Sequence, residues 1–518
     1  MLFETPNGMI PSATRIVLLC CLLAVTSAHG QETPRKQVKL VHADAILFDK
    51  SIVDAQRLIG HVNLLYEGTT FLCDSAYLYA NQDFDAFGYI RVNHPRGYSL
   101  TAGSMFFDKK TQTVLFRENV VMQDGEMTLE SSQLTYDMRG ETGRYTTGGK
   151  IVSRRNNNVL TSRRGTYSAR DKVFYFRDEV VLTNPDYTVL CDTLHYRELT
   201  ETAFFLGPTQ ITSEDTRIYC ENGWYNTRKD ISQFNEHARI TSDKTVLTGD
   251  SIYYDGKAGL GEVFRRVTIR DTTSSFIVRG NYGRHIKATE TSLVTEKALL
   301  IQVEGQDSLF MAADTLLLVP DSAGKQFIRA FHDVRVFRED LQGLADSLTY
   351  SESDSLLILF NQPVLWSQGN QITGDTIRIR TWKGTIDRMM VDGQPFIVSE
   401  AIAYDSTYTG QRRYNQIKGR HLVARFSDNQ IRRVRVEGNG QLIYYPAEEK
   451  EGKASLIGHN KGECSDLDIT ISGNQIRRIN LIREPDSVFT PIQMAVDITP
   501  ELEGFRWIGH LRPRREDL

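Results

Sequence analysis

The stretch GDSIYYD, residues 249–255, joins an acidic tripeptide to a run in which Ile252 and Tyr254 lie at alternate positions. Similar tripeptides recur along the chain, and the aligned positions 163, 192, 221 and 250 differ by 29 residues in each step. A fixed period is typical of repeat proteins, in which each unit buries its apolar face by stacking on its neighbours. The aligned positions are Asp74, Gly103, Glu130, Arg163, Asp192, Glu221, Asp250, Gly280, Asp314, Asp346 and Asp375.

Each unit also contains a second recurring phrase, as in FRDEVVL (176–182) and FNEHARI (234–240). An apolar period of two indicates β-strands, and short polar connectors such as DGKAGLG (255–261) suit hairpin turns. The sequence therefore predicts an all-β protein with two strands in each unit of about 29 residues. Because Asp side chains bond to backbone N–H groups in turns, we expect the acidic residue at a corner where a strand begins.

The composition agrees with an extended all-β chain and excludes some functions. Only 14 of 518 residues are proline, which leaves backbone N–H groups free for strand pairing. The 61 basic and 65 acidic residues leave a net charge of −4, so the chain lacks the basic signature of a nucleic-acid-binding protein.

The N-terminus is typical of an exported protein. An apolar run, IVLLCCLLAVTSA (16–28), follows a single arginine and precedes QETPRK, which is the pattern of a signal peptide. We expect residues 1–30 to be removed and the mature chain to be periplasmic. The alternative is that the segment stays as a membrane anchor, which would make the protein membrane-associated.

Cys73, Cys191, Cys220 and Cys464 remain in the mature chain. Cys191 and Cys220 are one period apart, so stacking of adjacent coils would bring them close enough for a disulfide. Side chains on in-register neighbours point the same way, which would strain such a bridge. We therefore expect buried free thiols.

Candidate catalytic motifs are explained by the repeat. GDSI (249–252) resembles the serine block of a hydrolase family, but it recurs as ADSL (345–348), and an enzyme does not need its nucleophile several times. The 11 histidines are scattered and no CxxC spacing occurs. We expect no enzyme activity, no cofactor and no metal.

The phrases GDSIYYD and ADSLTYS alternate with LFRENVVM (115–122) and AFHDVRVF (330–337) behind an export signal. This pattern, over about residues 38–400, resembles the OstA-like family, which includes the periplasmic lipopolysaccharide-transport protein LptA and the soluble N-terminal region of LptD. The resemblance implies an elongated open β-jellyroll around a groove for the acyl chains of lipopolysaccharide. It also implies a non-enzymatic role in a bridge to the outer membrane, with strand addition, end to end, to LptC-like and LptD-like jellyroll proteins.

One row of alternate side chains is the candidate lining of such a groove, provided that this parity faces inward. Burial of each CH₂ group contributes roughly 0.8 kcal/mol, so a continuous apolar row could hold an acyl chain. The alternative is that the row fills a dry core; the family resemblance favours the groove. The candidate residues are Leu134, Tyr136, Leu194, Tyr196, Ile252, Tyr254, Leu348, Tyr350, Ile377 and Ile379.

The repeat changes after about residue 400, so we expect a jellyroll array over 31–400 and a divergent terminal cap or docking section over 401–518. NQIRRVRV (429–436) is echoed by NQIRRINL (474–481), and EEKEGKAS (448–455) is expected to be a loop. The arginines of this section could bind lipid phosphates or form a solvated strand face. A different class of function is also open, namely an exported β-solenoid that binds glycans or acts as a scaffold.

Overall fold

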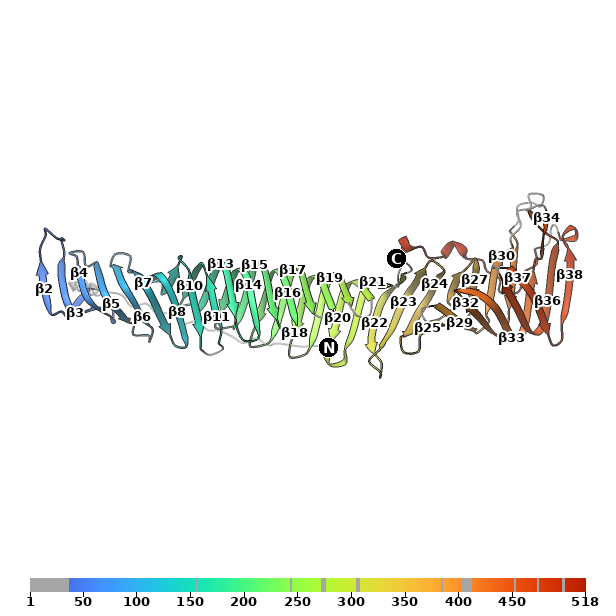
Figure 1. Ribbon diagram of the computed structural model, residues 1–518, viewed down its shortest axis with the longest axis horizontal. Helices are drawn as coiled ribbons and strands as arrows, with labels where there is room; N and C mark the ends of the chain where they lie inside the picture. Colours follow the sequence, from blue (N-terminus) through green and yellow to red (C-terminus); the bar gives the residue numbers. More distant parts are fainter. Residues whose placement is uncertain are drawn as a thin grey trace, which may run out of the picture.

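The computed structural model describes residues 37–518 except 155–156, 243–244, 272–275, 304–307, 383–384, 402–411, 451–452, 473–474 and 496–498. The described strands form one antiparallel sheet of 36 strands and a separate two-stranded hairpin. The sheet is wound into a long, narrow body (Figure 1), and an extent of about 130 Å follows from about 28 rungs spaced ~4.8 Å apart. The predicted elongated all-β jellyroll of two-strand repeats is confirmed. The predicted signal peptide lies outside the described residues, among which there is no helix long and apolar enough to span a bilayer.

Each long strand bends near its middle. The bend is illustrated by the pair of strands β13 (Val173–Thr183) and β14 (Tyr187–Arg197). Arg177 pairs with Thr193 and Val180 pairs with Cys191, so two residues of β13 lie opposite the single residue Asp192. Both extra residues have positive φ, as in a β-bulge, which bends a strand. Comparable positive-φ pairs are Glu118–Asn119, Asp178–Glu179, Glu236–His237, Arg265–Arg266, Glu296–Lys297, His332–Asp333 and Asn361–Gln362.

The predicted corner therefore exists, but it lies in the middle of a strand and not at its beginning. Asp192 is the sixth residue of β14, and strand pairing continues on both sides of it. Two aligned positions were also wrong. Ser132 occupies the corner of β8 (Met127–Asp137) instead of Glu130, and Asn281 occupies that of β20 (Phe276–Ile286) instead of Gly280.

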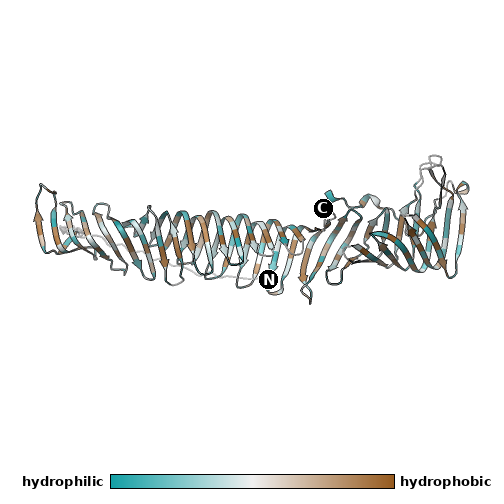
Figure 2. Cartoon of the chain, viewed as in Figure 1, coloured by the Kyte–Doolittle hydropathy of each residue, from teal (hydrophilic) through white to brown (hydrophobic). Residues whose placement is uncertain are grey.

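The bend divides the sheet into two walls that face each other. Wall A contains the segments that follow the corner residue on strands such as β14, and wall B contains the segments that precede it. Apolar residues alternate with polar ones along each wall (Figure 2), and the apolar rows of both walls face the interior. The interior is therefore most deeply buried along the line of corners. It reaches the surface at the opposite side, between the two rows of hairpins that end the walls. These two rows of hairpins are called here the rims.

The residue before each corner is small for a steric reason. In β18 (Thr245–Asp255), a Cβ atom on Gly249 would lie 2.4 Å from Cγ1 of Val263, and the same distance separates a Cβ on Gly374 from Cγ1 of Val391. A larger side chain at these positions would overlap a valine of the facing wall. This explains why Cys, Ala or Gly begins every recurring tripeptide.

The buried cysteines are small apolar residues of this kind. All four described cysteines are free, as expected. The expected closeness of Cys191 and Cys220 is wrong, because both pair with Thr209 on the intervening strand β15 (Thr202–Ser213). One period spans two strands, so the two cysteines are two rungs apart. Burial raises the pKa of Cys191 and Cys220 to about 12.

The N-terminal section begins with two short strands that share β3 as a partner. It ends with two short strands, one on either side of the corner residue Arg163. Its strands are β1 (Lys39–His42), β2 (Ala45–Phe48), β3 (Gln56–Tyr66), β4 (Thr69–Leu78), β5 (Phe84–Asn93), β6 (Ser99–Asp108), β7 (Thr113–Asp124), β8 (Met127–Asp137), β9 (Thr142–Tyr145), β10 (Gly149–Ser153), β11 (Val159–Ser162) and β12 (Arg164–Ser168).

The middle section is the most regular part, because each strand pairs with the next along the chain over both walls. One short 3₁₀ helix, η1 (Lys287–Thr289), interrupts a hairpin. The strands are β13 (Val173–Thr183), β14 (Tyr187–Arg197), β15 (Thr202–Ser213), β16 (Thr216–Asn226), β17 (Ile231–Ser242), β18 (Thr245–Asp255), β19 (Leu260–Asp271), β20 (Phe276–Ile286) and β21 (Thr291–Gln302).

The C-terminal section continues the same sheet past residue 400, where β30 pairs with β31. The expected loop at 448–455 instead contributes to the hairpin of β34 and β35. The elements are β22 (Leu309–Pro320), β23 (Gln326–Arg338), β24 (Leu341–Ser351), β25 (Leu356–Phe360), β26 (Val364–Ser367), β27 (Asn370–Thr373), β28 (Thr376–Trp382), β29 (Thr385–Asp392), β30 (Phe396–Glu400), β31 (Tyr414–Lys418), β32 (His421–Ser427), β33 (Gln430–Tyr444), β34 (Ala447–Lys450), β35 (Lys453–Leu456), β36 (Gly458–Ser472), β37 (Gln475–Ile482), β38 (Asp486–Pro491), η2 (Ile492–Met494), η3 (Gly509–Leu511) and η4 (Arg515–Asp517).

The last residues, 499–518, form a strap that runs back over the outer face of wall B toward β22 (Figure 1). Gln371 donates to the backbone oxygen of Arg506 at 2.7 Å and accepts from the backbone N–H of Ile508 at 2.8 Å. Gln416 makes the same kind of paired contact with the strap further back. Trp366 is the cross-strand partner of Gln342 on one side and of Gln371 on the other. Both glutamines bind the strap, and Trp366 between them is 2% exposed.

Candidate functional site

The candidate groove residues lie on wall A and face the interior, at two depths. The deep positions, two residues past a corner, are fully buried; Leu194 and Ile252 are 2% and 1% exposed. The shallow positions lie nearer the rim, where Tyr196 is half-buried and Tyr254 is 37% exposed. Among the other candidates, Leu134, Tyr136, Leu348, Ile377 and Ile379 are buried and Tyr350 is half-buried.

Wall B supplies an opposite row that the sequence reasoning missed. Its deep residues are buried, as Val180 and Ala238 are at 1% exposure each, and most of its residues nearer the rim are half-buried. The sequence does contain a signal for this row. In the residues before each tripeptide, apolar and polar side chains also alternate with a period of two. The shallow residues of this row in the middle section are Leu182, Tyr187, Ile211, Ile218, Ile240 and Leu247.

In the N-terminal section, polar contacts join the two rims. The hydroxyls of Tyr98 and Tyr136 are 2.6 Å apart, and both rings are buried. Gln112 donates to the hydroxyl of Tyr66 at 2.7 Å. Burial and the shared hydrogen bond raise the pKa of Tyr98, so both hydroxyls stay neutral and can hold this contact. These contacts close the mouth between the walls.

Two further contacts extend this closure. Tyr167 on the wall A rim donates to Asp124 on the wall B rim at 3.3 Å, and Arg96 forms an ion pair with Glu141 across the mouth. Burial is the main cause that raises the pKa of Tyr167, so its hydroxyl remains a donor. The four contacts together are called the rim clasp.

From β13 onward, apolar side chains border the opening between the rims. The core cluster of the middle section is bordered by half-buried apolar side chains along both rims, among them Tyr196 and Tyr225 on wall A and Ile218 and Ile240 on wall B. Apolar surface that is partly exposed in a continuous row can accept another apolar body. The middle section thus leaves the border of its apolar interior partly exposed along both rims.

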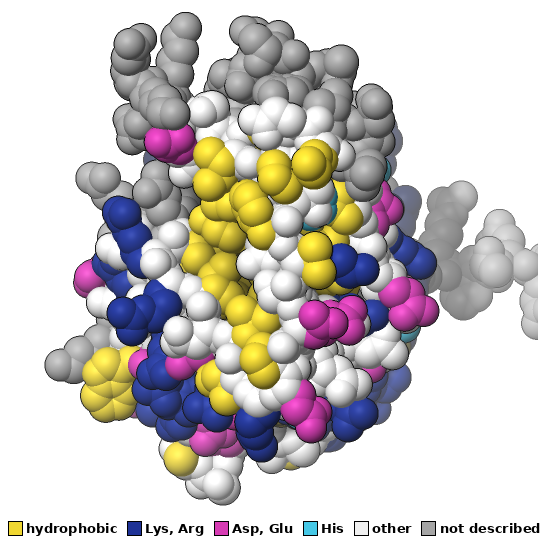
Figure 3. Space-filling model, turned by 90° about the vertical axis from the view of Figure 1, so that its right-hand side faces the viewer, with side chains coloured by type: hydrophobic (Ala, Val, Ile, Leu, Met, Phe, Trp, Pro, Cys, Tyr) yellow, Lys and Arg dark blue, Asp and Glu magenta, His cyan; other side chains and the backbone are white. Residues whose placement is uncertain are grey.

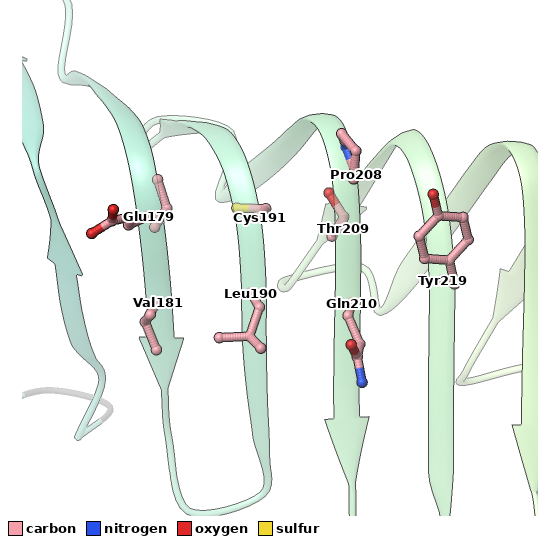
Figure 4. Close-up of a pocket in the computed structure, with 9 residues that line it drawn as sticks. Glu179, Val181, Leu190, Cys191, Pro208, Thr209, Gln210 and Tyr219 are labelled. Carbon is pink, nitrogen blue, oxygen red and sulfur yellow. The ribbon is translucent and has the colours of Figure 1, made fainter.

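The outer face also has a hollow, but of a different kind. A shallow depression of about 420 Å³ lies on the outside of wall B, where Val181, Leu190 and Tyr219 stand in a row across neighbouring strands (Figure 4). Leu190 and Tyr219 are 46% and 38% exposed, and their neighbours Cys191 and Cys220 face the interior. Its lining also includes Val180 and Cys191, which belong to the apolar cluster between the walls.

Both ends of the array are open edges. In the described part of the chain, β1 and β2 pair only with β3, and β37 and β38 pair only with β36. Phe48 is 60% exposed at one end and Val488 is 62% exposed at the other. Seen from the C-terminal end, an apolar strip runs between the polar flanks (Figure 3). Such edges can pair with another strand.

A comparison with protein families agrees with the sequence resemblance. Residues 35–192 match the family model described as OstA-like protein. Among solved structures, the chain is similar to LptH, described as the LptA homologous periplasmic component of the conserved lipopolysaccharide transport device from Pseudomonas aeruginosa. That likeness has 15% identity and a TM-score of 0.22, and it covers 29% of this chain and 95% of LptH. A TM-score at this level adds nothing to the assignment, and no curated protein matches the sequence. The chain is thus similar to the OstA-like family over residues 35–192.

Proposed function

We propose that the chain is a non-enzymatic periplasmic carrier that holds the acyl chains of lipopolysaccharide between walls A and B. The observation that carries this proposal is the two-depth interior of the middle section. Deep residues such as Leu194 are fully buried, whereas shallow residues such as Ile240 are half-buried. An acyl chain lying along the shallow rows would bury apolar surface on both walls at roughly 0.8 kcal/mol per CH₂.

Repetition suits transport along the array. Each pair of strands presents nearly the same apolar surface, so an acyl chain can move from one unit to the next without a large change in binding free energy. The rim clasp would confine side access to the stretch beyond β12. Lipid would then enter from the side in the middle section and leave along the interior.

The open edges support the proposed partners. A jellyroll protein at the inner membrane and one at the outer membrane could each add a strand to an end of this array, which would extend the apolar interior across the periplasm. Exposed apolar residues at both ends, such as Phe48 and Val488, would be covered by that contact.

The alternative is an exported glycan-binding or scaffold protein, which would display its aromatic residues outside. Tyr89 is 82% exposed and agrees with that alternative. Most aromatic side chains of the middle section point inward, as Phe176, Phe205 and Phe234 do at 2–4% exposure, which favours the carrier.

A charge placed on the inner rim tests the proposal. Ile240→Asp puts a carboxylate into the shallow row, whereas Thr241→Asp changes the next residue of β17, whose side chain faces outward. Loss of the burial of about two CH₂ groups predicts at least a tenfold weaker binding of labelled lipopolysaccharide for Ile240→Asp. The Thr241→Asp variant should bind normally. Equal binding by both variants would refute an interior site.

A further inference from the structure

Five arginines of the C-terminal section stand in one cross-strand row on the outside of wall A. Arg388 is the direct partner of both Arg380 and Arg425, and Arg425 is in turn the partner of Arg433. The row continues through Thr470 to Arg478. It crosses six rungs, a distance of about 24 Å. These residues, Arg380, Arg388, Arg425, Arg433 and Arg478, are called the arginine row.

The register that builds this row comes from three similar hairpins. The phrases TIDR (385–388), QIRR (430–433) and QIRR (475–478) each place one extra residue beside the hairpin, where the strand register shifts. The final arginine of each phrase is therefore carried to the same outward position. Two of these phrases can be recognised in the sequence, but only the strand pairing shows that their arginines lie in one row.

The guanidinium groups of the row are largely free of acidic partners. Arg433 donates to both oxygens of Asp468, with Nε 2.8 Å from Oδ1. Among the described residues, no carboxylate lies within ion-pair distance of the other four. Nε of Arg388 is buried without any hydrogen-bond partner. A buried donor without a partner is costly, so this arginine adds a further cost to the fold.

The fold does not require these arginines. Like charges directly opposite each other destabilise a sheet. At the corresponding position, five residues past the corner, β18 carries Asp255 and β24 carries Ser351, so the repeat accepts acidic and neutral side chains there. A concentration of positive charge that weakens the sheet is best explained by a ligand with complementary charge.

An exposed tryptophan indicates what kind of anion this is. Trp382 ends β28, two residues past Arg380, and is 69% exposed. Tryptophan prefers the boundary between lipid and water, and arginine binds phosphate with two parallel hydrogen bonds. The end view shows basic side chains gathered low on the C-terminal end of the molecule (Figure 3). We propose that the arginine row and Trp382 dock the C-terminal section onto the anionic phosphate surface of a membrane.

Vesicle binding tests this proposal with the mature chain. The triple variant Arg380→Gln, Arg425→Gln and Arg478→Gln removes three positive charges and keeps long polar side chains. Its matched control is Arg144→Gln, Arg239→Gln and Arg279→Gln, three exposed arginines of earlier strands. Binding is measured by sedimentation with vesicles of phosphatidylcholine, with and without a quarter of phosphatidylglycerol, at several salt concentrations.

We expect the wild type and the control to bind the anionic vesicles, and the triple variant to bind about 100-fold more weakly. Trp382→Ser should weaken binding to the same vesicles without changing the salt dependence. Circular dichroism checks that each variant is folded. Equal losses in the triple variant and the control would overturn the proposal. So would wild-type binding to neutral vesicles alone, or binding to a soluble anionic polysaccharide but not to vesicles. The outcome is independent of lipid binding between the walls, because these residues face outward.

Discussion

A single methyl group added at a corner should destabilise the array, and Gly249→Ala is the sharpest case. The new Cβ would lie 2.4 Å from Cγ1 of Val263, well inside van der Waals contact. Overpacking of a well-filled interior costs about 1–3 kcal/mol, whereas replacing glycine by alanine at a compatible φ recovers about 0.4–1 kcal/mol. The net expectation is a loss of about 1–2 kcal/mol in the free energy of local opening.

Gly261→Ala is the matched control, because Gly261 lies on the paired strand β19 and a Cβ there would meet only Tyr254 at 3.9 Å. This variant should be neutral or slightly stabilised. Hydrogen exchange read by mass spectrometry is the assay, because a long repeat array need not unfold in one step. Amides of β18 and β19 should exchange roughly tenfold faster in Gly249→Ala, since 1.4 kcal/mol corresponds to a factor of ten.

The double variant Gly249→Ala with Val263→Ala separates steric conflict from other causes. Removal of the Val263 methyl groups should relieve the conflict, so the double variant should lose less stability than the sum of the two single variants. Strict additivity, or unchanged exchange in Gly249→Ala, would refute the argument that close approach of the walls selects small residues at the corners.

Three further outcomes follow from other parts of the molecule. Gln371→Ala should loosen the C-terminal strap, because two partly buried backbone groups lose their hydrogen-bond partner at about 1 kcal/mol each. Trypsin should then cut at Arg506 faster than in wild type, and unchanged cleavage would contradict this. The hydrogen bond to Asp44 raises the pKa of His61 above 6.5, so its stabilisation is complete below pH 6.5 and is lost as the pH rises through the raised value; an NMR titration should show a normal pKa in Asp44→Asn and a raised one in wild type. Burial raises the pKa of Cys191 to about 12, so iodoacetamide should modify it at neutral pH only after unfolding, and fast labelling of the folded chain would oppose this.

Much of the fold could be predicted because its signal is periodic. The alternation of Leu194 and Tyr196 follows directly from strand geometry, and the step of 29 residues indicated two strands per unit. The mid-strand bend was missed because its bulge residues, such as Asp178, are ordinary polar residues that also suit a turn. Glu130 was misaligned because acidity was taken as the marker, whereas the small residue before the corner is the stricter steric requirement.

Only one of the two walls of the candidate site could be predicted, for a related reason. The tripeptide served as the anchor, so only the residues after it, on wall A, were identified. Wall B residues such as Val189 precede the anchor and were left out. The strap and the arginine row depend on contacts between segments far apart in sequence, such as Gln371 with Ile508, and no local pattern predicts them.

Photocrosslinking in living cells tests the carrier function most directly. A photoreactive residue at position 196 replaces a half-buried tyrosine that faces the interior. The same residue at position 195 replaces a histidine whose ring makes an edge-to-face contact with the outward-facing, exposed Tyr175. The two probes therefore differ by one residue and by the face of the strand. The carrier function predicts lipopolysaccharide adducts from position 196 and none from position 195. Adducts from position 195 alone, or from neither position in cells that export lipopolysaccharide, would contradict it.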